Sequence, residues 1–296
     1  MKSAVVVLCL LYSIASFAQG NAKWRSWNEP VEPFRIVGNV YSVGAREVSS
    51  FLITSPQEHI LLDGGFMQTA AIIRDNILKL GFKPQDVKYL VGSHAHFDHA
   101  GGLAQLKQWT GAKVAASRED GALMERGGRG DFAFGDKLTF PAVAPGRILV
   151  DGDIVSVGDA RLVAHLTPGH TKGCTTWTTE AEEDGRSYHV VFLCSTSVPG
   201  YTLLHNAAYP NIVNDYQGTF AYLKSLPCDV FLAPHGSMFR LIEKLAARKN
   251  AVGRNSFIDV GEFQAFVDRS KRQFEEELKR QERVGEARAG TCHNPR

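Results

Sequence analysis

The chain has 296 residues, of which 44% are apolar and 22% charged, with 33 basic and 31 acidic side chains and five cysteines. A globular chain of this length can bury a substantial core without a metal or a disulfide to hold it together. Its formal net charge of +2 leaves no large basic surplus to neutralise phosphates, which argues against a nucleic-acid ligand.

The first residues have the pattern of a secretory signal peptide. Lys2 precedes an apolar run from Ala4 to Leu11, and Ser16-Phe17-Ala18 supplies a small-x-small cleavage site. The run is far shorter than the roughly 20 residues that a membrane-spanning helix needs, so we expect no stable membrane insertion. We expect residues 1–18 to be removed, leaving residues 19–296 as a periplasmic or secreted chain in which disulfides are permitted.

The next part of the chain predicts a meander of strands followed by a helix. Strands are expected over Phe34–Val43, Ser50–Thr54 and His59–Leu62, where apolar residues alternate or run between turn residues. Apolar residues between Ala70 and Leu80 recur at helical spacing and stop at Gly81, a residue typical of the end of a helix.

Strands and helices alternate in the rest of the chain. The predicted strands are Val87–Val91, Lys113–Ala116, Arg161–Leu166, Cys174–Thr179, Tyr188–Cys194 and Val230–Ala233, and the predicted helices are Leu103–Trp109, Gln217–Leu226, Phe239–Ala247 and Val260–Arg283. Residues 285–296 are expected to be loose. Because no repeat and no Pro/Gly/Ser-rich linker divides the chain, we expect one continuous α/β domain of sheets flanked by helices.

One polar segment holds three histidines and an aspartate within six positions. His94, His96, Asp98 and His99 follow an apolar strand and precede Gly101-Gly102, which let a backbone turn sharply without steric cost. Imidazole and carboxylate groups are the usual ligands of zinc, and a solvated turn has no need of four of them. This segment is therefore a candidate metal site.

Two further histidines extend this site. His170 and His235 each follow an apolar strand, in the segments Thr167-Pro168-Gly169-His170-Thr171 and Ala233-Pro234-His235-Gly236. Together with the first segment they give six ligands from three strand ends, which is enough for two metal ions. The other histidines are scattered singly and are expected to be surface or core residues: His59, His165, His189, His205 and His293.

The spacing of these six residues resembles the metallo-β-lactamase superfamily over nearly the whole mature chain. The resemblance implies a four-layer αβ/βα sandwich with two Zn²⁺ per chain. It assigns the first zinc to His94, His96 and His170. It assigns the second zinc to Asp98, His99 and His235, with Asp98 also orienting the nucleophile.

The same resemblance implies an acid that orients the metal ligands without binding the metal. Asp63, in Leu61-Leu62-Asp63-Gly64-Gly65, matches an acid at an early strand end that orients the metal ligands. The residues alone also permit a plain turn acid at this position, so both roles stay open.

Further features resemble β-lactamases of the third class-B subclass. They are the export signal, the segments Pro33-Phe34-Arg35-Ile36 and Gly38-Asn39-Val40-Tyr41, and the pair Asp98-His99. First-subclass enzymes place a cysteine ligand where this chain has Ser195, and His99 would replace it. Ser195 and Ser197 would share one face of a strand and contact the substrate carboxylate. The implied activity is zinc-dependent hydrolysis of the amide bond of small β-lactam antibiotics, which confers resistance.

Two other functions remain open. An exported lactonase or esterase of the same superfamily would carry the same ligands. A non-catalytic zinc-binding protein of the envelope would need metal ligands too, although structural zinc sites are usually closed by four ligands and often use thiolates. A serine β-lactamase is contradicted, because the chain has no Ser-x-x-Lys, Ser-Asp-Asn or Lys-Thr-Gly segment.

The cysteine spacing predicts a disulfide. Cys174 and Cys194 flank a turn centred near Asp184-Gly185, and a hairpin there would set them opposite each other at bonding distance. A Cys174–Cys194 bridge would stiffen both the strand that carries Ser195 and the loop that carries His170. The sequence does not decide whether Cys228 and Cys292 pair.

Overall fold

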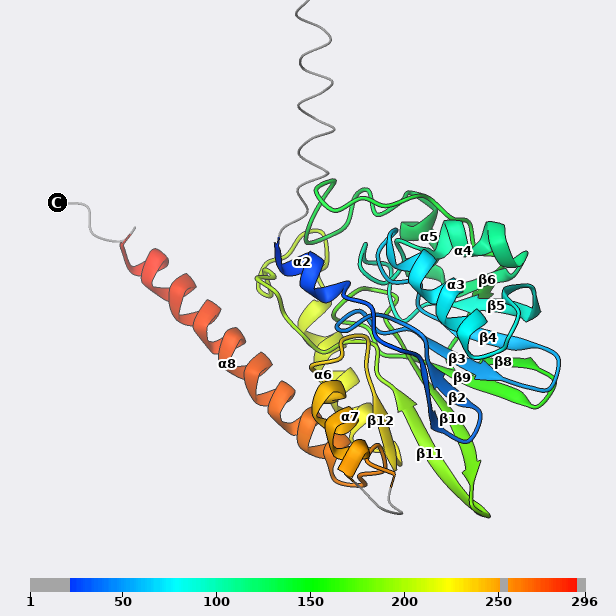
Figure 1. The fold of residues 1–296 in the computed structure, drawn as a ribbon. Helices are drawn as coiled ribbons and strands as arrows, with labels where there is room; N and C mark the ends of the chain where they lie inside the picture. Colours follow the sequence, from blue (N-terminus) through cyan, green and yellow to red (C-terminus); the bar gives the residue numbers. More distant parts are fainter. Residues whose placement is uncertain (1–21, 251–254, 292–296) are drawn as a thin grey trace, which may run out of the picture.

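The computed structural model describes residues 22–250 and 255–291, so the expected signal segment 1–18 lies outside the described residues. Figure 1 shows two sheets that lie between two groups of helices. Within the described residues, no helix has the length and apolar character required to cross a membrane.

The first sheet contains seven strands in sequence order. They are β1 Phe34–Val37, β2 Val40–Ser42, β3 Phe51–Thr54, β4 His59–Leu62, β5 Val87–Val91, β6 Lys113–Ser117 and β7 Arg147–Leu149. Strands β1 to β4 form an antiparallel meander, and β4 to β7 are parallel. The predicted meander is therefore confirmed.

The second sheet contains five strands in the order β12-β11-β10-β9-β8. They are β8 Ile154–Val157, β9 Ala160–Leu166, β10 Thr175–Glu183, β11 Arg186–Phe192 and β12 Val230–Leu232. Strands β8 to β11 are antiparallel, and β12 joins β11 in parallel.

Helices cover the outer face of each sheet. Helices α3 Thr69–Lys79, α4 Leu103–Thr110 and α5 Arg118–Glu125 pack on the first sheet, and α6 Ile212–Leu223, α7 Leu241–Asn250 and α8 Glu262–Thr291 lie on the side of the second. A short helix, α2 Ala22–Trp27, precedes β1, and a 3₁₀ turn, Pro84–Asp86, precedes β5.

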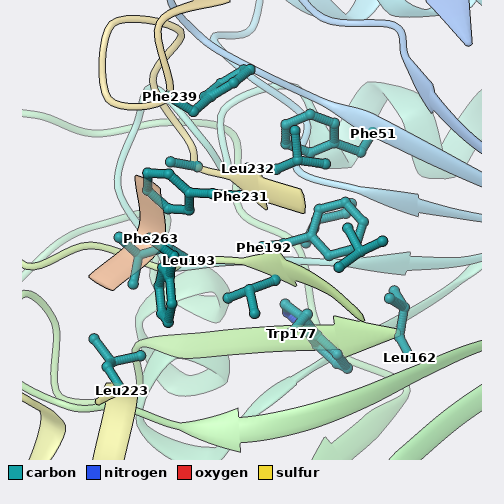
Figure 2. Packing of buried hydrophobic residues seen from close by; sticks show 14 of the residues in the cluster. Phe51, Leu162, Trp177, Phe192, Leu193, Leu223, Phe231, Leu232, Phe239 and Phe263 are labelled. Carbon is teal, nitrogen blue, oxygen red and sulfur yellow. The ribbon is translucent and has the colours of Figure 1, made fainter. Parts of the chain in front are cut away.

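Two apolar cores define the layers. One core joins the first sheet to α3 and α4, through residues such as Leu61, Ile73 and Leu106. The other fills the space between the sheets, where the rings of Phe51 and Phe192 lie 5.2 Å apart (Figure 2). Helix, sheet, sheet and helix therefore stack in four layers, as the resemblance implied.

The first predicted strand, Phe34–Val43, is wrong in one respect. Gly38 and Asn39 break it into the hairpin β1–β2, and Gly38 has a φ of +48°. A left-handed backbone conformation suits glycine and turns the chain back on itself, so the two halves pair with each other.

Four elements were not predicted from the sequence, and several predicted ends were misplaced: α6 begins at Ile212 rather than Gln217, and β10 continues to Glu183 rather than Thr179. Helices α2 and α5 and strands β7 and β8 are short, and α5 contains Gly121, which weakens a helical pattern. Residues 285–296 were expected to be loose, whereas α8 continues to Thr291. Its last residues include alanine, glutamate and arginine, which favour helix even without an apolar face.

The Cys174–Cys194 disulfide is confirmed, with the Cα atoms 5.8 Å apart. The hairpin turns at Asp184-Gly185, as predicted, and pairs Glu183 with Arg186. The cysteines are nevertheless not directly opposed, because Cys174 lies nine residues before Glu183 and Cys194 only eight after Arg186. They lie beyond the last pair of the ladder, where the register no longer constrains them.

Candidate metal centre

Three loops that follow buried strands meet at one end of the sandwich. The loop after β5 carries His94, His96, Asp98 and His99, the loop between β9 and β10 carries His170, and the loop after β12 carries His235. The first loop extends the seven-stranded sheet and the other two extend the five-stranded sheet. The site therefore forms only where both halves of the fold are packed together.

Three of the histidines form a compact group. His94, His96 and His170 each offer a ring nitrogen, and these donor atoms lie within 4.8 Å of one another. The ring centroids are separated by 4.8 Å for His94 and His96, by 4.7 Å for His94 and His170, and by 4.8 Å for His96 and His170. The sequence prediction placed these three residues on one metal ion, and the structure brings them together.

A second group lies against the first. His99 Nε2 is 3.5 Å from Asp98 Oδ2 and 3.3 Å from His235 Nε2, and His235 Nε2 is 3.7 Å from the same carboxylate oxygen. Donor atoms of His94, Asp98 and His99 also lie within 4.8 Å of one another, so the two groups are contiguous. All six predicted ligands thus converge.

The neighbours of the histidines indicate which ring nitrogen is left for a metal. His94 Nδ1 lies 3.0 Å from Ser93 Oγ, and His170 Nδ1 lies 2.9 Å from the Ser197 carbonyl oxygen. In each case Nε2 is left for the shared space. A hydrogen bond to the ring nitrogen that does not bind the metal fixes the tautomer and the orientation of a metal-binding histidine.

Each of the other three histidines has a carboxylate oxygen near one of its ring nitrogens. Asp131 Oδ2 lies 3.6 Å from His96 Nε2, Asp63 Oδ2 lies 3.5 Å from His99 Nδ1, and Glu47 Oε1 lies 3.8 Å from His235 Nδ1. These three ring nitrogens are buried and make no hydrogen bond to any residue that the structure describes. Five rings held from behind, with a carboxylate among their inward donor atoms, form a nitrogen and oxygen set that fits zinc.

Burial controls the charge of the imidazoles. It holds the pKa of His94 and of His170 well below the usual value, and it lowers the pKa of His235 to about 4. Neutral imidazole is the form that binds metals. Burial acts in the same direction on His99, but the carboxylates of Asp98 and Asp63 outweigh it and raise the pKa of His99 to about 10.

Asp63 lies where the sequence analysis placed it, at the end of β4 beside the first metal-binding loop. It is buried, its φ is +64°, and its carboxylate accepts hydrogen bonds from Ser93 N at 2.6 Å and Ser93 Oγ at 2.7 Å. It also lies 3.5 Å from His99 Nδ1, so it is a buried neighbour of a predicted ligand and not an exposed turn acid.

Asp120, a buried acid in the first turn of α5, was not predicted to belong to the site. Its carboxylate accepts hydrogen bonds from Ala95 N at 2.9 Å, Thr171 Oγ1 at 2.8 Å and Gly173 N at 3.0 Å. It therefore ties the loop of His94 and His96 to the loop of His170. Burial raises the pKa of Asp120 to about 6, although these hydrogen bonds favour the charged form.

The two predicted substrate-binding serines lie beside His170. Strand β11 ends at Phe192, so Ser195 and Ser197 follow the strand and the prediction that they share a strand face is wrong. Their hydroxyls are nevertheless 3.2 Å apart, and Ser197 Oγ lies 3.3 Å from His170 Nδ1. Tyr216 OH donates to the Ser197 carbonyl oxygen at 2.6 Å and so fixes this segment from behind.

Aromatic rings surround the metal-binding residues. Phe134 lies 5.2 Å from the His96 ring, Trp27 lies 5.0 Å from the His235 ring, and Tyr201 lies 5.7 Å from the His170 ring, measured between centroids.

A cavity of about 290 Å³ opens between Phe132–Phe134 and residues 199–207. A cavity of about 540 Å³ lies between Leu204-His205 and the end of α8, and none of the six ligands lines it.

Gly101 was expected to allow a sharp turn, but it is required because there is no space for a side chain. It does not make a left-handed turn, but a Cβ at this position would lie 2.3 Å from the Phe97 carbonyl oxygen. The loop of metal-binding residues can therefore fold tightly against the start of α4 only with glycine at this position.

A family model and solved structures show similarity to the same superfamily. Residues 43–235 match the family model of the metallo-β-lactamase superfamily. A metallo-β-lactamase from Cronobacter sakazakii described by its HARLDQ motif is 40% identical with a TM-score of 0.84, covering 88% of this chain and 99% of that one. FEZ-1 from Legionella gormanii is 40% identical with a TM-score of 0.84, covering 86% of this chain and 98% of that one.

Another solved structure and the curated relatives extend the comparison. BJP-1, a subclass B3 metallo-β-lactamase of Bradyrhizobium japonicum, is 36% identical with a TM-score of 0.82, covering 88% of this chain and 98% of that one. Among curated relatives, a hydroxyacylglutathione hydrolase of Maricaulis maris is 36% identical over 81 residues, which is 27% of this chain and 25% of that protein. The chain spans a quarter to just over half the length of the first curated relatives it matches. The match to the family model and the similarity to these structures show that the chain belongs to the metallo-β-lactamase superfamily.

Proposed function

We propose that this protein hydrolyses the amide bond of β-lactam antibiotics with two bound zinc ions and so confers resistance. The observation that carries the proposal is the convergence of six donor residues, five of them buried and His235 half-buried, in two contiguous groups from three loops. The substrate class is supported by similarity to metallo-β-lactamases over nearly the full length of their structures.

In this proposal each of the two groups of residues binds one metal ion. His94, His96 and His170 hold the first ion, and Asp98, His99 and His235 hold the second. Bound zinc lowers the pKa of water from about 15.7 to roughly 7 and polarises a carbonyl group, which supplies a nucleophile at neutral pH without a serine.

The protein side chains bind and orient the reactants. Ser195 and Ser197 donate hydrogen bonds to the carboxylate of the substrate, since their hydroxyls lie together beside His170. The carboxylate of Asp98 accepts a hydrogen bond from the attacking water and orients it. Phe134 and Trp27 cover the His96 and His235 rings and limit the access of bulk water.

We further propose that the chain is exported, with cleavage near Ala18. The Cys174–Cys194 disulfide supports an oxidising compartment, because such bonds persist mainly outside the cytosol. Intact-mass measurement of the protein from periplasmic and culture fractions tests this. A protein that stays in the cytosol with residues 1–18 attached would contradict it.

The activity is tested with purified, zinc-loaded protein. We expect turnover of a chromogenic cephalosporin, a penicillin or a carbapenem, its loss after dialysis against a chelator, and its return with zinc. A homoserine lactone and an acyl thioester serve as comparison substrates.

The outcomes separate the alternatives. Lactone or thioester turnover without any β-lactam turnover would replace the proposal with the lactonase or esterase function. Zinc binding without turnover of any of these substrates would leave a zinc-binding protein.

A further inference from the structure

The loop between α5 and β7 reaches the first group of histidines through one acid. Asp131 Oδ1 accepts hydrogen bonds from Ala133 N at 2.8 Å and Phe134 N at 2.7 Å, which form a tight turn. The other oxygen, Oδ2, lies 3.6 Å from His96 Nε2. The side chains of Asp131 and His96 are only 4% and 7% exposed, so water does not screen this contact.

The two facing atoms have no other partner. His96 Nε2 and Asp131 Oδ2 are both buried, and neither makes a hydrogen bond within the described part of the chain. A histidine that binds a metal through Nδ1 carries its proton on Nε2, and a buried N–H needs an acceptor. Asp131 Oδ2 is placed to be that acceptor.

We propose that Asp131 is a positioning residue, which fixes the tautomer and orientation of His96 for metal binding and couples it to the Phe132–Phe134 turn. The proposal rests on zinc binding by the first group of histidines.

The coupling follows from the contacts of the turn. Phe134 packs on the His96 ring at 5.2 Å between centroids, and Phe132 packs on Tyr201 and on Tyr209, each at 5.0 Å. The same turn lines a cavity of about 290 Å³, although none of the six proposed ligands lines it. One carboxylate therefore holds both a proposed ligand and the turn that packs on its ring.

The test is Asp131→Asn, because asparagine can keep the acceptor oxygen for Ala133 N and Phe134 N. It replaces Oδ2 by an amide N–H group, which cannot accept the proton of His96 Nε2. We expect the affinity for one of the two zinc ions to fall about 10- to 100-fold, the usual effect of losing a second-shell partner, while the other ion binds as in the wild type. Competition with a chromophoric chelator measures both affinities.

Two further variants make the result specific. Asp136→Asn is the matched control, since Asp136 is exposed and its carboxylate accepts a hydrogen bond from Gly130 N in the same loop. It should leave both zinc affinities unchanged. Asp131→Ser can still accept from the turn N–H groups but does not reach His96, so it should reproduce the loss and replaces Asp131→Asn if that variant does not fold.

The outcomes distinguish this inference from the proposed function. Wild-type affinity for both ions in Asp131→Asn and Asp131→Ser, or an equal loss in Asp136→Asn, would overturn the inference. A wild-type protein that binds no zinc would overturn both proposals. Selective loss of one ion, in a protein that hydrolyses no β-lactam, would support the inference and overturn only the proposed function.

Discussion

Each histidine of the metal centre uses its two ring nitrogens differently. One nitrogen faces the space shared by the six donor residues, and the other faces a hydroxyl, a carbonyl or a carboxylate of the protein. A side chain held from behind in this way loses little further freedom when a ligand binds, so the site is organised in advance.

Asp98 is expected to matter for activity far more than for stability. Asp98→Asn removes the only predicted carboxylate ligand and the group that orients water. We expect β-lactam turnover to fall by more than about 100-fold, since losing a second-shell partner alone costs about 10- to 100-fold. The unfolding free energy of the zinc-free protein should also fall, because the folded state lowers the pKa of Asp98 and so favours its charged form beside His99, but the fold should persist.

The matched control for this prediction is Asp159→Asn, an exposed acid, which should change neither turnover nor stability. If Asp98→Asn kept wild-type turnover and altered only the number of bound zinc ions, a binding function would be favoured over catalysis.

Asp120 gives a prediction for pH dependence. Its pKa is raised from 3.8 to about 6 in the folded protein, so between these values the folded state holds a proton that the unfolded state has released. The unfolding free energy should therefore fall as the pH rises from about 4 to 6, by roughly 3 kcal/mol from this group. Asp120→Asn removes this contribution, so its stability relative to the wild type should improve from pH 4 to pH 7.

Denaturant unfolding of the zinc-free proteins at several pH values measures the difference. Asp159→Asn again serves as the control and should follow the wild type at each pH. A difference between wild type and Asp120→Asn that is independent of pH would show that burial does not raise the pKa of Asp120.

At the scale of the element, the β10–β11 hairpin links two parts of the site. Its disulfide joins Cys174, shortly after His170, to Cys194, next to Ser195. Cys194 Sγ also lies 3.1 Å from the Ser93 carbonyl oxygen, just before the first metal-binding loop. The disulfide is therefore in contact with, or next in sequence to, three of the segments that contain predicted site residues.

Removing this bridge is expected to lower stability. A disulfide that closes a loop of 20 residues should contribute about 3 kcal/mol, mainly by constraining the unfolded chain. The double variant Cys174→Ala, Cys194→Ala should therefore unfold at a lower denaturant concentration than the oxidised wild type. Cys228→Ala, at a half-buried free thiol, is the control, and equal stability of all three proteins would contradict the prediction.

The elements that the sequence predicted best are those with a strong local pattern. Strand β5 and helices α3 and α4 were placed to within one residue, because each has an apolar face with a clear period and helix α3 is followed by a glycine. Strand β8 is short and lies at an edge, and α5 contains a glycine, so their local patterns were too weak. Packing against the rest of the fold decides such elements.

At the scale of the whole molecule, the metal centre joins the two halves of the sandwich. His94, His96, Asp98 and His99 extend from the seven-stranded sheet, whereas His170 and His235 extend from the five-stranded sheet. Bound zinc would therefore oppose separation of the sheets, and its binding free energy would add to the stability of the fold.

This arrangement predicts a large effect of metal on thermal unfolding. Free zinc at 100 times its dissociation constant should add about 2.7 kcal/mol per site, which is roughly 5 to 10 °C in Tm for a chain of this size. Differential scanning calorimetry with zinc and with a chelator measures the shift. His170→Ala should reduce it and the half-exposed His189→Ala should not, while the same Tm under both conditions would contradict a metal site between the sheets.

Features that depend on residues close together in the chain could be predicted from residue type and spacing. The segment of metal-binding residues, the hairpin turn and the disulfide are of this kind, because residue type and short spacing define them. Only the tertiary structure revealed Asp120, Asp131, Glu47 and Trp27, which reach the site from other parts of the chain. Asp120, for example, bonds to residues 25 and 51 positions away, and packing of the two sheets decides such contacts, since no local pattern encodes them.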